Sequence, residues 1–225
     1  MMKLVPISLL ILLAATAASA QVVQPGSDLV LFGGGASSSF TGSDKALLGD
    51  GTRTGTTAGL GYVLRVNPDF GFEVDVRMTQ KGGEGTIDIT DYTGANNGPT
   101  IVGEGTTRLT YLEIPLMLAV QLGISKSSHL RAYGGPSINI LVSANFEGVI
   151  QGQEQKVDIN EGIKGNEVGL ALGGGWTYDA GKASLWVDGR WSFGLASISD
   201  TSKDRDIKNQ SWEFALGVGV PLSRE

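Results

Sequence analysis

The sequence predicts an all-β fold: an eight-stranded antiparallel up-and-down transmembrane β-barrel with short periplasmic turns and long extracellular loops. Three observations support this prediction: apolar alternation along eight segments, connections that alternate between short and long, and hairpin registers that keep one face polar. The clearest alternation runs over residues 210 to 222, where Trp212 and Phe214 point to one face and Glu213 and Ala215 to the other. Because successive strand residues face opposite sides, one face of this segment suits lipid and the other suits a crowded interior.

The first twenty residues have the pattern of a secretory signal. Lys3 precedes an apolar run over residues 4–17, and Ala18-Ser19-Ala20 forms a small-x-small cleavage site. The run is shorter than the ~20 residues that a helix needs to cross a bilayer, which favours a cleaved leader over a membrane anchor. We therefore expect a signal peptide over 1–20 and an outer-membrane β-barrel domain over 21–225.

Composition narrows the class of protein further. Loss of Lys3 with the leader changes the net charge of −6 by one unit, so the mature chain is acidic and binding to nucleic acid is disfavoured. The chain has 34 glycines, one histidine and no cysteine, which is unusual for a soluble enzyme and rules out disulfides. The longest later apolar stretch, residues 114–120, is too short for a spanning helix, so the chain is expected to cross the membrane as strands.

The order of strands and connections gives the topology. We expect strands over 28–39, 54–66, 70–80, 106–122, 129–143, 165–178, 183–195 and 210–222. Short turns fall at 67–69, 123–128 and 179–182, whereas the connections at 40–53, 81–105, 144–164 and 196–209 are long and polar. This asymmetry is typical of an outer-membrane barrel with its short turns in the periplasm, and a soluble β-sandwich has no reason to sort its loops by length.

The hairpin closed by residues 67–69 sets charged residues opposite small ones. Pairing Val66 with Phe70 places Arg77 opposite Gly59, Asp75 opposite Gly61 and Glu73 opposite Val63. An eight-stranded barrel is only just wide enough inside for side chains, so a bulky polar group benefits from a glycine across from it.

The hairpin closed at Ala180-Gly181 gives the same result. Its expected pairs are Trp186 with Gly175, Asp188 with Gly173, Arg190 with Ala171, Leu170 with Trp191, and Val168 with Phe193. One face of this hairpin is again polar and the other apolar.

Acidic and basic side chains occupy the alternate strand positions that face the interior, and together they form one expected lumen charge network. Its members are Arg65, Glu73, Asp75, Arg77, Glu113, Arg131, Glu167, Asp188, Arg190 and Glu213. Isolated charges in a narrow interior would be costly, so we expect a paired network that fills the barrel, with Arg131 as a candidate partner of Glu113. A proton or ion path is the alternative interpretation.

Aromatic and proline positions add detail. Tyr111 and Tyr133 share the inward parity, whereas four aromatic residues are expected to face outward as an interface girdle: Tyr62, Tyr178, Trp191 and Trp212. Pro115 and Pro136 lie inside strands and nearly opposite one another, which predicts a shared bulge or a local strand bend.

Signals for catalysis are weak, and we expect neither an enzyme nor a cofactor. The single histidine, His129, starts a strand beside a short turn and is expected to be a solvated rim residue. The acidic residues Asp200, Asp204 and Asp206 alternate with basic ones, so a solvated loop is favoured over a calcium site. No catalytic, cofactor-binding or metal residue is assigned.

One group of motifs carries a family resemblance. Tyr111-Leu112-Glu113-Ile114-Pro115, together with Gly71-Phe72-Glu73, Gln80-Lys81-Gly82-Gly83 and Gly134-Gly135-Pro136, resembles the PorT-like outer-membrane β-barrel domain family of Gram-negative bacteria. The resemblance covers essentially all of the mature chain and implies an OmpA/OmpX-like eight-stranded barrel. The family takes its name from a member linked to protein secretion, so an accessory role in secretion is one function that the resemblance suggests.

Two classes of function follow. The first is a structural or interaction protein whose loops over 81–105 and 144–164 meet an envelope or surface protein. We expect this protein to be a monomer in an environment of lipid bilayer and lipopolysaccharide. The second is a small solute pore or transporter, which would need an open lumen.

Overall fold

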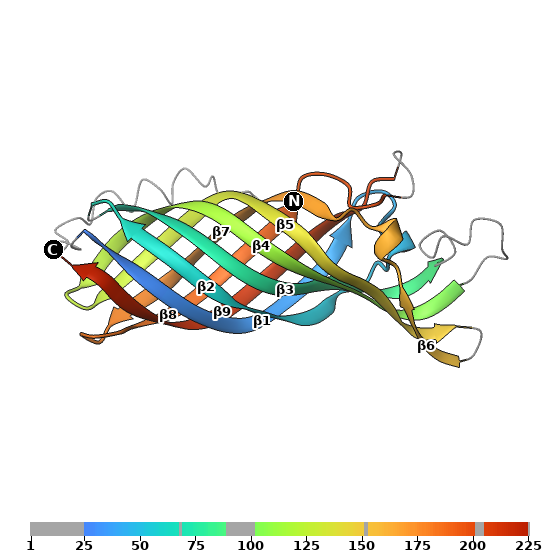
Figure 1. Ribbon diagram of the computed structural model, residues 1–225, viewed down its shortest axis with the longest axis horizontal. Helices are drawn as coiled ribbons and strands as arrows, with labels where there is room; N and C mark the ends of the chain where they lie inside the picture. The colour runs from blue at the N-terminus through green and yellow to red at the C-terminus, as the bar shows by residue number, and fades with distance from the viewer. Residues whose placement is uncertain (1–24, 68, 89–101, 151–152, 201–204, 225) are drawn as a thin grey trace, which may run out of the picture.

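The computed structural model describes residues 25–67, 69–88, 102–150, 153–200 and 205–224. The expected signal peptide over 1–20 lies outside these residues, so its cleavage stays a prediction. Antiparallel strands dominate the described chain and form one elongated barrel (Figure 1). The strands are β1 (Gly26–Thr41), β2 (Arg53–Arg65), β3 (Phe70–Asp88), β4 (Val102–Ser125), β5 (Ser128–Ile150), β6 (Gln153–Asp158), β7 (Asn166–Asp179), β8 (Ser184–Gly194) and β9 (Lys208–Arg224).

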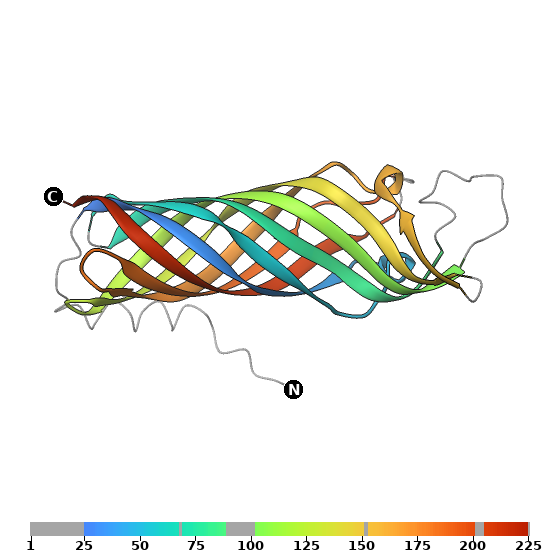
Figure 2. The ribbon, with the colours of Figure 1, turned by 60° about the horizontal axis from the view of Figure 1, so that its bottom comes forward.

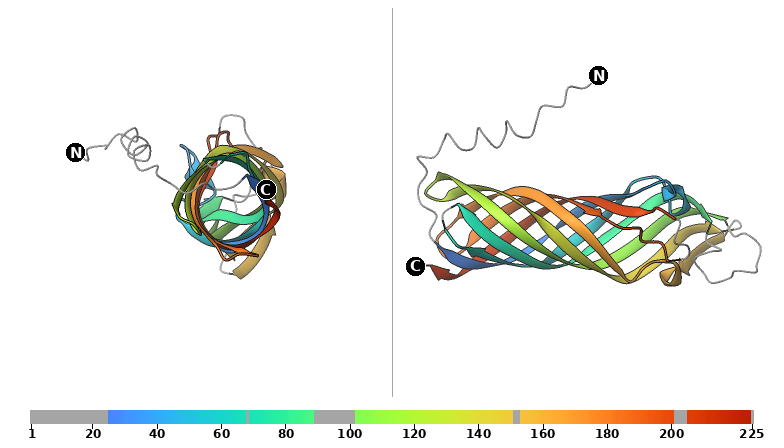
Figure 3. Two further views of the ribbon diagram at one scale, coloured as in Figure 1. Left: turned by 90° about the vertical axis from the view of Figure 1, so that its left-hand side faces the viewer. Right: turned by 90° about the horizontal axis from the view of Figure 1, so that it is seen from above.

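Eight of these strands close into a ring. They follow the order β4-β3-β2-β1-β9-β8-β7-β5, and the pairing of β4 with β5 completes the circle, which the end-on view in Figure 3 shows. β6 stays outside the ring and pairs with the extracellular end of β5. The predicted all-β, eight-stranded antiparallel barrel is confirmed. Closure leaves no unpaired edge within the ring, which is a requirement for strands that cross a membrane.

Several strands are longer than predicted at the extracellular end. β3 continues to Asp88, β4 begins at Val102, β5 continues to Ile150, and part of the expected loop over 144–164 is the strand β6. These extensions project beyond the ring as a sheet (Figures 1 and 2). Their residues are mostly glycine and polar side chains, because a strand beyond the lipid needs no apolar outer face. Apolar alternation therefore could not detect them.

The hairpin registers are confirmed in one case and corrected in the other. β2 and β3 pair Gly59 with Arg77 and Gly61 with Asp75, as predicted. In the β7–β8 hairpin the predicted pairs are wrong by two residues, since Asp188 lies opposite Gly175 rather than Gly173.

The turn between β7 and β8 explains this error. The Ala180 N–H donates to the Ala183 carbonyl oxygen at 2.8 Å, and Gly181 has a φ of 85°. The turn is therefore centred one residue later than predicted, at a glycine that tolerates the left-handed conformation. Because the shift is an even number of residues, every side chain keeps its predicted face.

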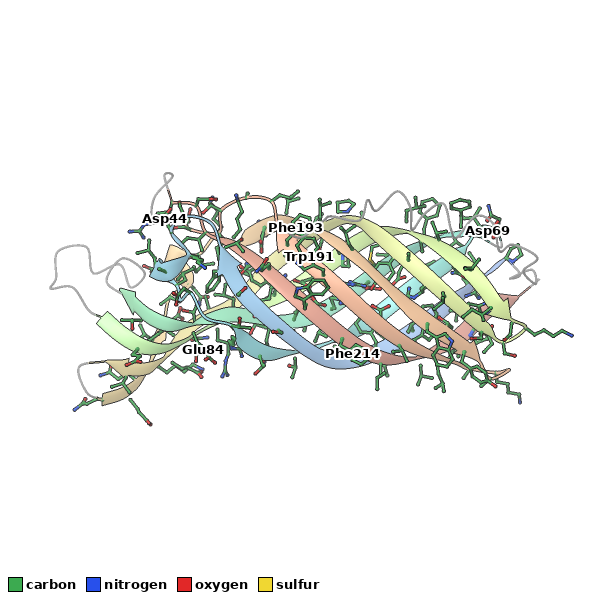
Figure 4. The ribbon with its side chains drawn as sticks, turned by 180° about the vertical axis from the view of Figure 1, so that it is seen from behind. Asp44, Asp69, Glu84, Trp191, Phe193 and Phe214 are labelled. Carbon is green, nitrogen blue, oxygen red and sulfur yellow. The ribbon has the colours of Figure 1, made fainter. Side chains whose placement is uncertain are left out.

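The outer face is an apolar belt. Large side chains that point outward are strongly exposed, among them Trp212 with 65% and Leu216 with 58% of its surface. Trp191 stacks on Trp212 with ring centroids 5.8 Å apart, and Figure 4 shows Trp191 and Phe214 on the outside of the wall. Tyr62 and Tyr178 are exposed as predicted. Among the described residues, no helix is long and apolar enough to cross a membrane.

The predicted bulge at the two prolines is wrong. Pro115 lies opposite Ser137, and β4 and β5 keep the same register on both sides of the prolines. The register instead shifts between Thr110 and Tyr111. Near Pro115 and Pro136 the ladder is interrupted and then resumes, because proline lacks the N–H that a ladder bond requires.

A lipid-facing belt predicts how charge is tolerated along the outer wall. Leu216→Arg should destabilise the barrel by about 2–4 kcal/mol, because it places a charge at mid-belt, whereas Thr54→Arg at the extracellular end of β2 should cost about 0–1 kcal/mol. Urea unfolding in lipid vesicles measures both. Equal effects of the two substitutions would contradict the position of the belt.

Candidate functional site

β3 supplies the centre of the lumen because a charged or hydroxyl side chain occupies every second position. Glu73, Asp75, Arg77, Thr79 and Lys81 all point inward and are buried. Their outward neighbours, such as Val74 and Val76, belong to the apolar belt. One strand therefore presents both charge signs to the rest of the barrel.

The middle of the lumen holds a continuous set of ion pairs. Arg77 Nη1 lies 2.5 Å from Glu213 Oε2 and Arg77 Nη2 lies 3.1 Å from Asp75 Oδ2. Arg190 Nη2 lies 2.8 Å from the same Asp75 oxygen. The Arg77–Glu213 pair joins β3 to β9, and the Asp75–Arg190 pair joins β3 to β8, so both connect strands that are not neighbours in the ring.

Arg131 on β5 connects the remaining acids of this layer. Its guanidinium contacts both Glu73 and Asp188, and the Tyr133 hydroxyl donates to Asp188. The guanidinium also lies over the Trp186 ring, 4.3 Å from the centroid. The predicted pairing of Arg131 with Glu113 is therefore wrong.

The partner of Glu113 is Lys81, at an Nζ–Oε1 distance of 2.5 Å. The Thr79 hydroxyl donates to the other carboxylate oxygen at 3.0 Å. Sequence reasoning placed Lys81 in a loop because the predicted strand ended at residue 80. Lys81 is separated from Arg77 by an even number of residues, so a longer predicted strand would have placed its side chain in the lumen.

Glu167 has a different environment from the other acids. Its side chain is buried, and the ion pairs found among the described residues do not include it. The Asn209 amide donates to Glu167 Oε2 at 2.9 Å and to the Tyr111 hydroxyl at 3.1 Å. The structure thus places Glu167 in the lumen but outside the central ion pairs.

The periplasmic end contains a separate pair and the single histidine. Arg65 makes two bonds to Asp28, at 2.6 and 3.0 Å. Asp28 shares its inward parity with Val30, a signal that sequence reasoning missed. The expectation of a solvated His129 is wrong, since the side chain is buried and its Nε2 lies 3.2 Å from Asp179 Oδ2.

Glycines opposite the charged side chains make the network possible. A Cβ on Gly61 would lie 2.6 Å from Asp75 Oδ1, a contact that real Cβ atoms do not make. Asp75 is itself held between two arginines. A cavity between the charged side chains of this layer has a volume of about 20 Å³, which is room for about one water molecule.

An apolar cap covers the extracellular end of the lumen. We define it as the cluster of Phe40, Leu48, Leu109, Tyr111, Ala144, Phe146, Ile159, Ile163, Ile198 and Ile207. Its members come from strand ends, from residues next to the short helices η1 (Lys45–Leu47) and η3 (Asn160–Gly162), and from the β8–β9 connection. Its members come from distant parts of the sequence, so periodicity within one strand could not reveal it.

Hydrogen bonds outside the membrane hold the connections that form the cap. The Asp206 N–H donates to the Asp44 carboxylate at 2.9 Å, and this bond, with one from the Ser43 hydroxyl, holds the pKa of Asp44 below its usual value. The Gly51 N–H donates to the Glu84 carbonyl oxygen at 2.8 Å. No group of three or more potential metal ligands occurs in the part of the chain that the structure describes.

The buried Lys81–Glu113 pair predicts a strong stability effect. Lys81→Met leaves the Glu113 carboxylate buried without its cation and should cost about 3–5 kcal/mol, whereas Lys81→Met with Glu113→Leu should recover most of this loss. The control is Lys156→Met at the more exposed Lys156–Glu147 pair, where a loss under about 1 kcal/mol is expected. Urea unfolding in detergent micelles gives these values, and equal losses for both lysines would refute the burial argument.

The apolar cap predicts a second effect. Phe146→Ala should cost about 3–5 kcal/mol, because it opens a cavity among fully buried side chains. Val149→Ala on the same strand is the control, since Val149 is 45% exposed and a surface change should stay within about 0.5 kcal/mol. The same unfolding experiment compares them, and a harmless Phe146→Ala would mean that the cap contributes little.

Several solved structures are similar to this chain. Neisserial surface protein A is similar, with 15% identity, a TM-score of 0.51, and coverage of 87% of this chain and 98% of that one. OprG from Pseudomonas aeruginosa has 14% identity, a TM-score of 0.45 and coverage of 88% and 97%. Ail of Yersinia pestis has 17% identity, a TM-score of 0.42 and coverage of 86% and 98%.

Sequence comparison gives the family. No curated protein matches this sequence. A family model described as outer membrane protein beta-barrel domain matches residues 20–200, which is most of the chain. The chain therefore belongs to this family of outer-membrane β-barrel proteins.

Proposed function

We propose that this protein is a closed outer-membrane barrel that acts as a structural or interaction protein through its extracellular end. The observation that carries the proposal is the set of ion pairs across the lumen, from Arg77 to Glu213 and from Arg190 to Asp75. Each guanidinium lies where a water-filled channel would have to pass. An interior of this size is filled by side chains in small barrels.

Two further features favour a closed barrel rather than an open pore. The central cavity has room for about one water molecule, and the apolar cap lies above it at the extracellular end. An ion entering from outside would have to displace the cap, lose its hydration and break buried pairs. Each of these steps costs free energy.

The proposed interaction surface is the extracellular sheet and the connections packed around the cap. It corresponds to the sequence expectation for loops over 81–105 and 144–164, of which residues 89–101 and 151–152 lie outside the described chain. Its exposed charged side chains are mainly acidic, as the described members Asp50, Glu84, Glu104, Glu154, Asp158, Glu161 and Asp200 illustrate. A partner protein with a basic surface would complement this charge. We propose that the barrel itself is a monomer and that it has no enzymatic role.

An accessory role in protein secretion is a narrower proposal that rests on the PorT-like resemblance. Tyr111 and Glu113 of the resembling motif point into the lumen, where they contact Asn209 and Lys81. These contacts support a structural use of the motif within the barrel.

Planar-bilayer conductance tests closure directly. The purified protein should give no steady single-channel current, because the proposed network of ion pairs leaves no continuous water path across the charged layer. An open porin in the same bilayer serves as the positive control. Large, steady currents from the wild-type protein would favour the pore over the proposed function.

Site-specific photo-crosslinking in native membranes tests the interaction surface. A photoreactive residue in place of Gln155, on the exposed strand β6, should capture a discrete protein partner. The same residue in place of Lys126, in the periplasmic turn, should not capture that partner. Capture of the same partner from both positions, or from neither, would argue against recognition at the extracellular end.

A further inference from the structure

The outer wall carries an apolar groove in its periplasmic half. It runs across β1, β9, β8 and β7, has a volume of about 630 Å³, and is lined by Leu31, Gly33, Trp176, Leu185, Leu216 and Val218 among others. Trp176 lies three residues before the end of β7 at Asp179, and Leu185 is the second residue of β8. Both strand ends are periplasmic, which places the groove on that side of the membrane.

A missing side chain helps to form the hollow. Gly33 occupies an outward position on β1, between the belt residue Leu31 and a second outward glycine, Gly35. A Cβ on Gly33 would meet no atom closer than 3.9 Å, and the same holds for Gly35. Packing within the protein therefore does not demand glycine at either position, and only Gly33 lines the groove.

One wall of the groove is fixed by a polar contact. The Trp176 indole Nε1–H donates to the Ser128 hydroxyl at 2.6 Å, and the ring stacks near Tyr178 with centroids 5.9 Å apart. Tryptophan and tyrosine prefer the level of lipid headgroups. The periplasmic end of the groove therefore lies at the interface, with its apolar length extending into the acyl-chain region.

Two lysines lie in the turns next to this end. Lys182 is in the β7–β8 turn, roughly 10 Å along the chain from Leu185 at about 3.3 Å per residue, and Lys126 is in the β4–β5 turn. Ser128 pairs with Tyr178, which brings the two turns side by side. Both lysines are exposed. The neighbouring carboxylate of Asp179 is in contact with His129, so Lys126 and Lys182 are the exposed positive charges of these two turns.

We propose that this groove holds one acyl chain of an anionic glycerophospholipid from the periplasmic leaflet, with its phosphate near Lys126 and Lys182. The apolar lining and a volume within the usual range of ligand sites suit an alkyl chain. The positive charge at the periplasmic end suits the headgroup. A lipid that reaches the groove from the periplasmic leaflet places its phosphate at these turns, whereas a lipopolysaccharide in the outer leaflet would place its phosphates at the opposite end.

Native mass spectrometry of the mature protein, released from micelles with added phosphatidylglycerol, tests the site. The wild type should retain one phosphatidylglycerol, and at least tenfold less phosphatidylethanolamine at the same concentration. Gly33→Leu should fill the groove and lower retention of phosphatidylglycerol at least tenfold. Lys182→Glu should lower it severalfold while leaving the groove open.

Gly35→Leu is the matched control, because it adds the same side chain to the same strand outside the groove. It should retain phosphatidylglycerol like the wild type, and a heat-dependent shift in electrophoresis confirms that each variant is folded. Equal retention by Gly33→Leu and the wild type would overturn the site. Equal loss in Gly35→Leu, or equal retention of phosphatidylethanolamine by the wild type, would overturn it as well.

Discussion

Charge pairing inside a narrow lumen is the constraint on which the rest of this structure depends. Arg77 lies between Asp75 and Glu213, and Arg190 shares Asp75, so removal of Arg77 leaves the Glu213 carboxylate buried without its paired cation. These pairs connect β3 with β8 and β9 across the ring. They require glycine at positions such as Gly61, where a side chain would occupy the space of the Asp75 carboxylate. The buried charges therefore depend on the glycines that make room for them.

The extracellular end is stabilised by a different interaction. There an apolar cluster is buried, in which Phe40, Phe146 and Ile198 pack together above the Lys81–Glu113 pair. Ion pairs fill the lumen where the barrel wall is continuous. The apolar cap replaces them where the wall gives way to short helices and connections. The cap fixes those connections on the barrel, which would give the proposed interaction surface a rigid base.

Much of the fold could be predicted because a register error of two residues does not change which side chains face inward. The β2–β3 register followed from one short turn, and even the misplaced β7–β8 register kept Asp188 and Arg190 inward. Lys81 and the apolar cap could not be predicted in the same way. Lys81 lies where the strand leaves the lipid and apolar alternation ends, and the cap joins Leu48, Ile159 and Ile207, whose proximity depends on the closed ring. The pairing of Glu113 with Lys81 rather than Arg131 likewise depends on the positions of these side chains along the barrel axis. The alternation of inward and outward residues does not give those positions.

Solid-state NMR of the protein in lipid bilayers, with labelled arginine and carboxylate groups, tests the central claim most directly. We expect through-space contacts from the Arg77 guanidinium to the Glu213 and Asp75 carboxylates, with slow exchange of the guanidinium protons with water. Loss of these contacts, together with rapid water exchange at Arg77 and Arg190, would mean that the lumen is hydrated and that its charges are not paired.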